Sequence, residues 1–167
     1  MKKFILATIL FANALFCNAQ EFMGVKVEGT TTSIISQFKS KGFTLQKSES
    51  DYVFLTGSMK GVEVEVHAFF TATTKKCYRF TIYLPKQTSW YSLKTEYNDY
   101  LNVLTEKYGK PTKSYETFLD PYYEGDGYET TAVAAEKCFF ASWWDDIYIE
   151  ISISKFKQTN TTLAQFK

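Results

Sequence analysis

The sequence predicts an α+β protein in which an antiparallel sheet carries two helices packed on one face. Three features support this fold class: two segments with helical periodicity, a strictly alternating segment between them, and an apolar hairpin near the end of the chain. Helices gathered on one face of an antiparallel sheet form a common two-layer arrangement. The order of these segments is a helix followed by three strands, twice.

The first predicted helix lies between Thr30 and Gly42. Thr30 to Thr32 offer N-cap hydroxyls, Ile34, Ile35 and Phe38 form an apolar stripe, and Lys41-Gly42 is a typical helix end. Three strands are expected after this helix, in DYVFLTG, GVEVEVHAFF and KCYRFTIYL.

The middle one of these strands alternates between two faces without interruption. One face carries Val62, Val64, Val66, Ala68 and Phe70, and the other carries Glu63, Glu65, His67 and Phe69. This is the pattern of a half-buried strand, and it predicts a solvated face for His67. In the next strand, Tyr78, Phe80, Ile82 and Leu84 are expected to share a face.

The second half repeats this plan. Ser89 can cap a helix in which Leu93, Tyr97, Leu101, Leu104 and Tyr108 recur at helical spacing, until Gly109-Lys110-Pro111 stops it. Strands are then expected in KSYETFL, EKCFFASWW and IYIEISISK, with an acidic loop after the first.

The parity of the last hairpin predicts which of its aromatic residues are buried. If Asp145-Asp146 is a two-residue turn, Trp144 pairs with Ile147. Trp144, Ser142, Phe140 and Cys138 then share the buried face with the isoleucines that follow. Trp143, Phe139 and Tyr148 fall on the opposite face.

The first 19 residues have the pattern of a secretory signal peptide. Lys2 and Lys3 precede an apolar run from Phe4 to Phe16, which is too short to span a bilayer and ends at small residues. We expect cleavage before Gln20 or Glu21, and attachment of a lipid at Cys17 is disfavoured because Phe16 is not small. Residues 20–167 then form a single α+β domain with halves at 20–86 and 87–167, located in the periplasm or secreted.

Charge argues against nucleic acid as a partner. Removal of Lys2 and Lys3 leaves 17 basic residues against 18 acidic ones, the chain has one arginine, and its lysines are scattered. Binding to a phosphate backbone needs a clustered excess of lysine and arginine. No stable membrane insertion is expected either, because the only long apolar run belongs to the predicted signal peptide.

Few residues could support catalysis or bind a metal. His67 is the only histidine. Glu63, Glu65 and His67 lie at alternate positions of one strand, so the three side chains spread over roughly 13 Å and are too far apart to share an ion. Neither a metal site nor a cofactor is predicted. A hydrolase based on carboxylate pairs stays an alternative, with candidates Asp120, Glu124, Asp126, Glu129, Asp145 and Asp146.

Two cysteines, Cys77 and Cys138, follow the predicted signal peptide, one in each half. In an exported chain they could form a disulfide that joins the halves, or stay as buried thiols. Parity opposes the disulfide because Cys77 is out of phase with Tyr78 and Phe80, although a bulge or a position at the start of the strand would allow it.

The acidic segment DPYYEGDGYE, residues 120–129, is the strongest candidate for recognition. Tyrosine supplies rigid amphipathic contact area, and glycine lets a loop turn. Tyr122, Tyr123 and Tyr128, together with Trp143, are therefore the predicted ligand-binding residues. The competing interpretation is a structural loop whose tyrosines pack against the sheet.

At Lys107-Tyr108-Gly109-Lys110-Pro111, where a helix ends and antiparallel strands follow, the chain resembles small exported envelope modules of the SmpA/OmlA and beta-lactamase-inhibitor-protein type. It is also similar in plan to short signal-bearing proteins of Gram-negative bacteria. The resemblance implies a non-enzymatic role in which sheet and loop surfaces contact another protein. We therefore expect an exported binding or scaffolding protein whose partner is a protein or glycan of the cell envelope, with an inhibitor of a secreted or periplasmic enzyme as the alternative.

Overall fold

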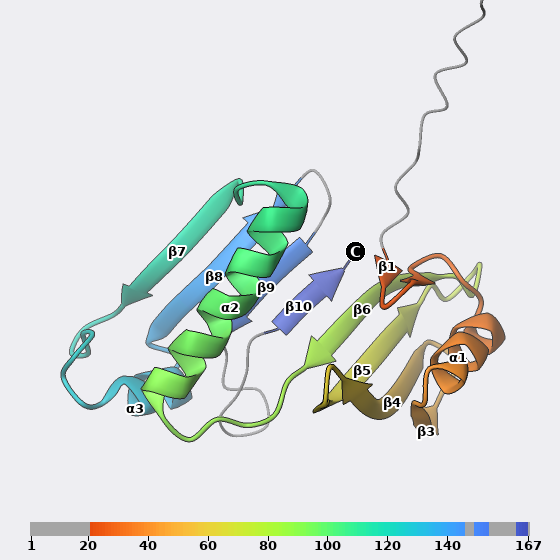
Figure 1. Cartoon of the computed structure of the whole chain (residues 1–167), viewed down its shortest axis with the longest axis horizontal. Helices are drawn as coiled ribbons and strands as arrows, with labels where there is room; N and C mark the ends of the chain where they lie inside the picture. Colours follow the sequence, from red (N-terminus) through yellow and green to blue (C-terminus); the bar gives the residue numbers. More distant parts are fainter. Residues whose placement is uncertain (1–20, 146–148, 154–162, 167) are drawn as a thin grey trace, which may run out of the picture.

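The computed structural model describes residues 21–145, 149–153 and 163–166, and within them the fold is α+β with antiparallel sheets. Figure 1 shows a broad twisted sheet with α1 and α2 in front of its two ends. In chain order the elements are β1 (Glu21–Phe22), β2 (Val25–Lys26), α1 (Thr31–Ser40), β3 (Thr44–Ser48), β4 (Tyr52–Met59), β5 (Val62–Phe70), β6 (Cys77–Tyr83), α2 (Trp90–Tyr108), β7 (Lys113–Phe118), α3 (Glu129–Ala134), β8 (Cys138–Trp144), β9 (Ile149–Ile153) and β10 (Leu163–Phe166).

The large sheet consists of two four-stranded meanders that meet in its centre. Its strand order is β3-β4-β5-β6-β10-β9-β8-β7, so β6 pairs with β10, with Phe80 opposite Phe166. The sequence predicted three strands after each of the two helices, but four strands follow each of α1 and α2 among the described residues. β3 was missed because TLQKS is an exposed edge strand with little alternation, and β10 because LAQF is only four residues long.

The helix boundaries follow the predicted caps. The Thr30 hydroxyl accepts a hydrogen bond from the Ser33 N–H, and Ser89 accepts one from the Ser92 N–H at 3.1 Å. Gly109 follows α2 with φ +83°, a conformation that glycine adopts without strain. A third helix, α3, adds to the two predicted ones and buries Ala132 and Val133.

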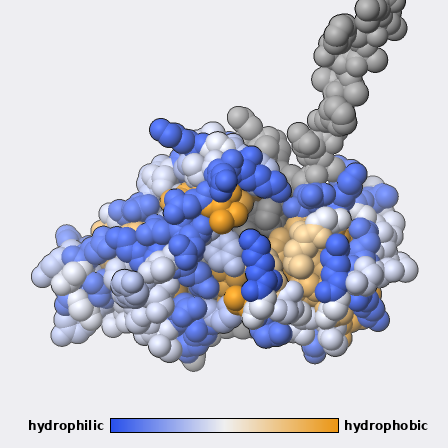
Figure 2. Space-filling view, in the orientation of Figure 1, coloured by the Kyte–Doolittle hydropathy of each residue, from blue (hydrophilic) through white to orange (hydrophobic). Residues whose placement is uncertain are grey.

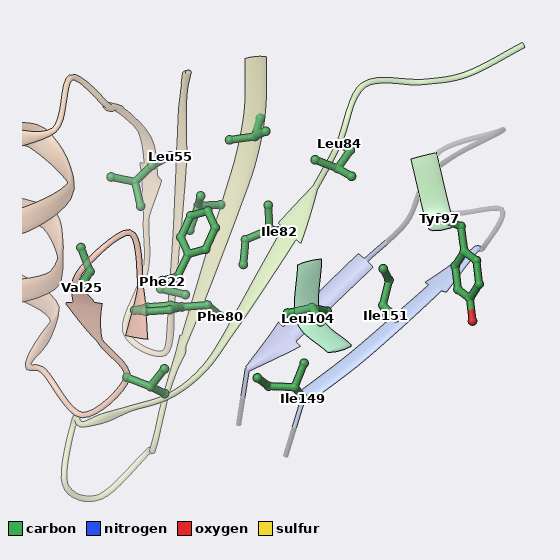
Figure 3. Close-up of a cluster of buried hydrophobic side chains, with 14 of the residues drawn as sticks. Phe22, Val25, Leu55, Phe80, Ile82, Leu84, Tyr97, Leu104, Ile149 and Ile151 are labelled. Atoms are coloured by element: carbon green, nitrogen blue, oxygen red, sulfur yellow. The ribbon is translucent and has the colours of Figure 1, made fainter. Parts of the chain in front are cut away.

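The hydrophobic core lies between the helices and one face of the sheet. Ile34 and Phe38 of α1 pack near Phe80 of β6, and Leu93 and Tyr97 of α2 pack over β8 and β9. Figure 3 shows the middle of this core, where side chains from β1, β6, α2 and β9 approach one another. None of the helices among the described residues is long and apolar enough to cross a membrane.

An irregularity between β5 and β6 changes one predicted face. Phe69 pairs with Arg79, but Phe70 pairs with Cys77, so Tyr78 is an extra residue in β6. Phe80, Ile82 and Leu84 are buried as predicted, whereas Tyr78 is exposed and Cys77 enters the core. A bulge shifts the alternation by one residue and therefore exchanges the faces beyond it.

The last hairpin keeps its predicted faces despite a different register. Trp144 pairs with Ile149 and not with Ile147. The shift is two residues, and because side chains alternate with a period of two, parity is unchanged. Ser142, Phe140 and Cys138 are buried with the isoleucines of β9 as expected. Tyr148, predicted on the opposite face, lies outside the described residues.

Candidate functional site

The segment from Leu119 to Glu129, here called the tyrosine loop, connects β7 to α3 at the outer end of the sheet (Figure 1). The carboxylate of Asp126 accepts two hydrogen bonds from the loop backbone. Its Oδ1 accepts the Tyr128 N–H at 2.7 Å, and its Oδ2 accepts the Tyr123 N–H at 3.0 Å. Glu129 is buried, and its Oε1 accepts the Gly125 N–H at 2.8 Å. The loop backbone is therefore ordered by its own acidic side chains.

The three tyrosines of this loop have different environments. Tyr123 is 65% exposed and Tyr128 is 62% exposed. Tyr122 is partly buried and packs against the core. The loop thus presents two of its three tyrosines to solvent and uses the third to attach itself to the domain.

Trp143 does not join the tyrosine loop. It neighbours the buried Trp144 in β8 and so points to the face opposite α1 and α2, where its ring lies 5.6 Å from that of Tyr115. It pairs with Lys113 at the start of β7, about 17 Å along the strand from the loop that follows Phe118. The four residues predicted to bind a ligand therefore occupy two separate surfaces.

Four of the six acidic residues considered as hydrolase candidates make structural contacts. Asp126 and Glu129 bind loop amides, Glu124 forms an ion pair with Lys94, and Asp145 forms one with Lys113 at 2.9 Å. Asp146 lies outside the described residues.

A different pair of carboxylates, Glu96 and Asp99 on α2, lines a shallow pocket beside the turn between β4 and β5. Burial raises the pKa of Glu96, and a hydrogen bond with Gln87 opposes that shift. Their spacing of three residues places both on one side of the helix. The sequence contained this spacing, but it is common on exposed helices and carried no signal.

His67 is buried, which corrects the prediction of a solvated side chain. It is 6% exposed, and its ring lies 4.8 Å from that of Phe54 and 4.7 Å from that of Tyr83. Nδ1 is 3.1 Å from the Tyr52 hydroxyl, and Nε2 is 3.4 Å from Oε2 of Glu65. Aromatic neighbours on β4 and β6 cover a position that the sequence of β5 alone marked as polar.

The two cysteines are free buried thiols, so the predicted alternative of a disulfide is not realised. The bulge in β6 does place Cys77 on the core side, but β10 and β9 lie between β6 and β8. Three strand spacings alone put β6 and β8 about 14 Å apart, whereas a disulfide requires Cα atoms within roughly 7 Å. Among the described residues, no group of three or more histidine, cysteine or acidic side chains could hold a metal ion.

A groove in the middle of the helix-bearing face, here called the central groove, was not predicted. Its volume is about 510 Å³. One wall is α2, the other is β1 with the turn between β4 and β5, and the floor is formed by β6 and β9. It is lined by Glu21, Phe22, Met23, Met59, Lys60, Ile82, Leu84, Tyr100, Val103, Leu104, Lys107, Tyr108 and Ile151. Figure 2 shows hydrophobic surface in the centre of this face with hydrophilic side chains beside it.

The chain matches no protein-family model, no curated protein and no solved structure. The resemblance to exported envelope modules therefore stays a prediction.

Proposed function

We propose that this protein is an exported, non-catalytic binding protein that recognises another protein of the cell envelope through the tyrosine loop. The observation that carries the proposal is the combination of two largely exposed tyrosines, Tyr123 and Tyr128, with a loop backbone that Asp126 and Glu129 hold in place.

Ordering before binding supports recognition because a loop that is already ordered loses less conformational entropy when a partner binds. Tyrosine adds to this advantage, since it buries a large area while restricting only two side-chain torsions. The partly buried Tyr122 and the Lys94–Glu124 ion pair attach the loop to the domain. The exposed tyrosines therefore form a rigid surface of the kind that contributes most to protein interfaces.

Export rests on the sequence pattern of residues 1–19. In that setting the partner is another envelope protein, and a glycan that stacks on the tyrosine rings is the competing outcome of the test. Trp143 and Tyr115 provide a second aromatic surface on the opposite side of the sheet. They are not part of the proposed site.

The test compares the double variant Tyr123→Ala/Tyr128→Ala with the control Tyr91→Ala. Tyr91 lies on α2 and is 80% exposed, so the control removes an even more exposed ring outside the loop. Each protein is immobilised and incubated with an envelope extract of the native cells, and retained proteins are quantified by mass spectrometry. We expect the double variant to retain at least tenfold less of each partner that the wild type and Tyr91→Ala retain.

Equal retention by all three proteins would remove the loop from the function. Retention of soluble cell-wall glycan in place of protein, with the same dependence on the two tyrosines, would show that the site recognises sugar. Circular dichroism of the double variant should match that of the wild type because both rings are mainly in solvent.

An inhibitor of a secreted or periplasmic enzyme is the second candidate function. The observation that favours it is the position of the tyrosine loop at the outer end of the sheet, beyond β7 (Figure 1), where it can enter a concave site on a partner. Stoichiometric loss of a hydrolase activity from the same extract, absent with the double variant, would distinguish inhibition from simple binding.

A further inference from the structure

The central groove is a second feature with the properties of a binding site, and it is separate from the tyrosine loop. Ten of its thirteen lining residues are apolar or aromatic, and the other three are Glu21, Lys60 and Lys107. Pockets for small molecules occupy roughly 300–1,000 Å³ and combine an apolar lining with a few polar groups. At about 510 Å³ the groove falls within this range.

The shape of the groove follows from α2. Tyr100, Val103, Leu104, Lys107 and Tyr108 line it at spacings of three and four residues, which places them on one side of the helix. The rise from Tyr100 to Tyr108 is about 12 Å. The groove is therefore an elongated channel parallel to two turns of α2.

The floor of the groove is apolar and continuous with the hydrophobic core. Ile151 is 0% exposed and Ile82 is 2% exposed, and both also belong to the hydrophobic core. Figure 3 shows Ile82 on β6, Leu104 on α2 and Ile151 on β9. Because these side chains already pack in the core, a ligand would find a preformed surface.

Charge determines which end group suits the groove. Lys60 and Lys107 outnumber Glu21, and none of the ion pairs among the described residues involves either lysine. The Nζ atom of Lys107 lies 4.8 Å from the centre of the Tyr108 ring, so a positive charge stands beside the apolar channel. This combination complements a hydrocarbon chain that ends in an anion.

We propose that the central groove binds the monomeric form of a single-chain anionic amphiphile, a long-chain carboxylate, with the hydrocarbon along α2 and the carboxylate near Lys107. A recessed groove of about 510 Å³ suits one hydrocarbon chain better than a flat protein interface, which normally covers about 800 Å² on each partner. The site is independent of the tyrosine loop and does not rest on the function proposed for it.

The experiment measures binding of dodecanoate to the purified chain by titration calorimetry, below the concentration at which the probe forms micelles. Dodecyltrimethylammonium, which has the same chain and the opposite charge, is the matched probe. We expect dodecanoate to bind more tightly than the cation, and its affinity to rise by up to roughly fourfold for each methylene added from decanoate onwards. Methyl NMR signals of Ile82, Leu104 and Ile151 should shift on addition, and those of Val53, a core residue outside the groove, should not.

Two variants with matched controls locate the site. Val103 lines the groove and is 50% exposed, so Val103→Glu should fold normally and weaken dodecanoate at least roughly tenfold, because a carboxylate would then stand in the channel. Phe139→Glu is the control, since Phe139 is 48% exposed on the opposite face of the sheet. Lys107→Glu should weaken dodecanoate about fivefold, while Lys39→Glu, in the last turn of α1, should not change binding.

Several results would overturn the proposal. They are the absence of heat and of methyl shifts with dodecanoate, equal affinity for the cationic probe, or equal affinity in wild type and Val103→Glu. Binding only to vesicles of anionic phospholipid, and not to the monomeric probe, would assign the groove to a membrane surface. A dimer that Val103→Glu dissociates, in a protein that ignores dodecanoate, would assign it to a second copy of this chain.

Discussion

The phenolic oxygen of Tyr97 lies 2.7 Å from the hydroxyl oxygen of Ser142, and this hydrogen bond joins α2 to the middle of β8. Both residues are fully buried, and the hydroxyl of Ser142 is also 2.8 Å from that of Ser114 on β7. Burial raises the pKa of Tyr97, so its phenol remains protonated in neutral solution. A polar chain therefore connects the helix to two strands through an otherwise apolar core.

Removal of Ser142 should destabilise the protein more than removal of the Tyr97 hydroxyl. Ser142→Ala removes the closest hydrogen-bond partner of a buried phenol and leaves Ser114 as the other, and we expect it to cost about 1–3 kcal/mol of unfolding free energy. Tyr97→Phe leaves Ser142 bonded to Ser114 and should cost about 1 kcal/mol. Urea unfolding measures both, with the exposed Ser58→Ala as control. A Ser142→Ala variant as stable as wild type would show that the bond contributes nothing.

Gly57 in β4 is required for close packing of the ring of Phe43. A Cβ atom at position 57 would lie 2.5 Å from a carbon of that buried ring, a separation that forces one of the two to move. Gly57→Ala should therefore lower the unfolding free energy by about 1–3 kcal/mol in urea titration. Phe43→Leu combined with Gly57→Ala should recover part of the loss, and strictly additive losses would contradict the steric explanation.

The two thiols should be unreactive in the folded protein. Burial raises the pKa of Cys77 to about 11 and that of Cys138 to about 12, and only the thiolate is nucleophilic. At pH 8 we expect no reaction with a thiol-specific chromogenic disulfide, and full reaction in denaturant. Rapid labelling of the native protein would show that one cysteine is accessible.

The same shifts predict a loss of stability at alkaline pH. Unfolding exposes both thiols to water and returns each to its ordinary pKa of 9.0, so above pH 9 the unfolded chain loses these protons before the folded chain does. The contribution is complete below pH 9 and declines as pH rises toward 11 and 12. Between about pH 8 and pH 10, the urea midpoint should fall more for wild type than for Cys77→Ala/Cys138→Ala. An equal fall in both proteins would show that the thiols do not contribute to the loss of stability.

Asp126 should control the order of the tyrosine loop. Asp126→Ala removes the acceptors for the N–H groups of Tyr123 and Tyr128, so both amides should exchange with solvent at least roughly tenfold faster. Partner capture should weaken as well, because binding must then order the loop. Glu116→Ala, an exposed acidic residue on the adjacent β7, is the control for lost charge. Unchanged exchange would show that the loop is held by its other contacts.

Local structure and strand parity could be predicted from the sequence. Thr30, Ser89 and Gly109 mark helix ends because capping depends on neighbouring residues only. The buried face of β8 and β9 was predicted correctly although the turn length was wrong, since an even shift in register leaves every side chain on the same face. The exposure of Tyr123 and Tyr128 was an open question in the sequence, because nothing local distinguishes them from Tyr122.

The amino-acid sequence by itself determined the α+β class, the helix caps and the alternation of each regular strand, all of which depend on residues close together in the chain. Only the tertiary structure decided that His67 is buried, that two strands separate Cys77 from Cys138, and that α2 and β1 enclose the central groove. These features depend on which strands become neighbours. Strand order reflects the packing of residues far apart in sequence, and no local pattern encodes it.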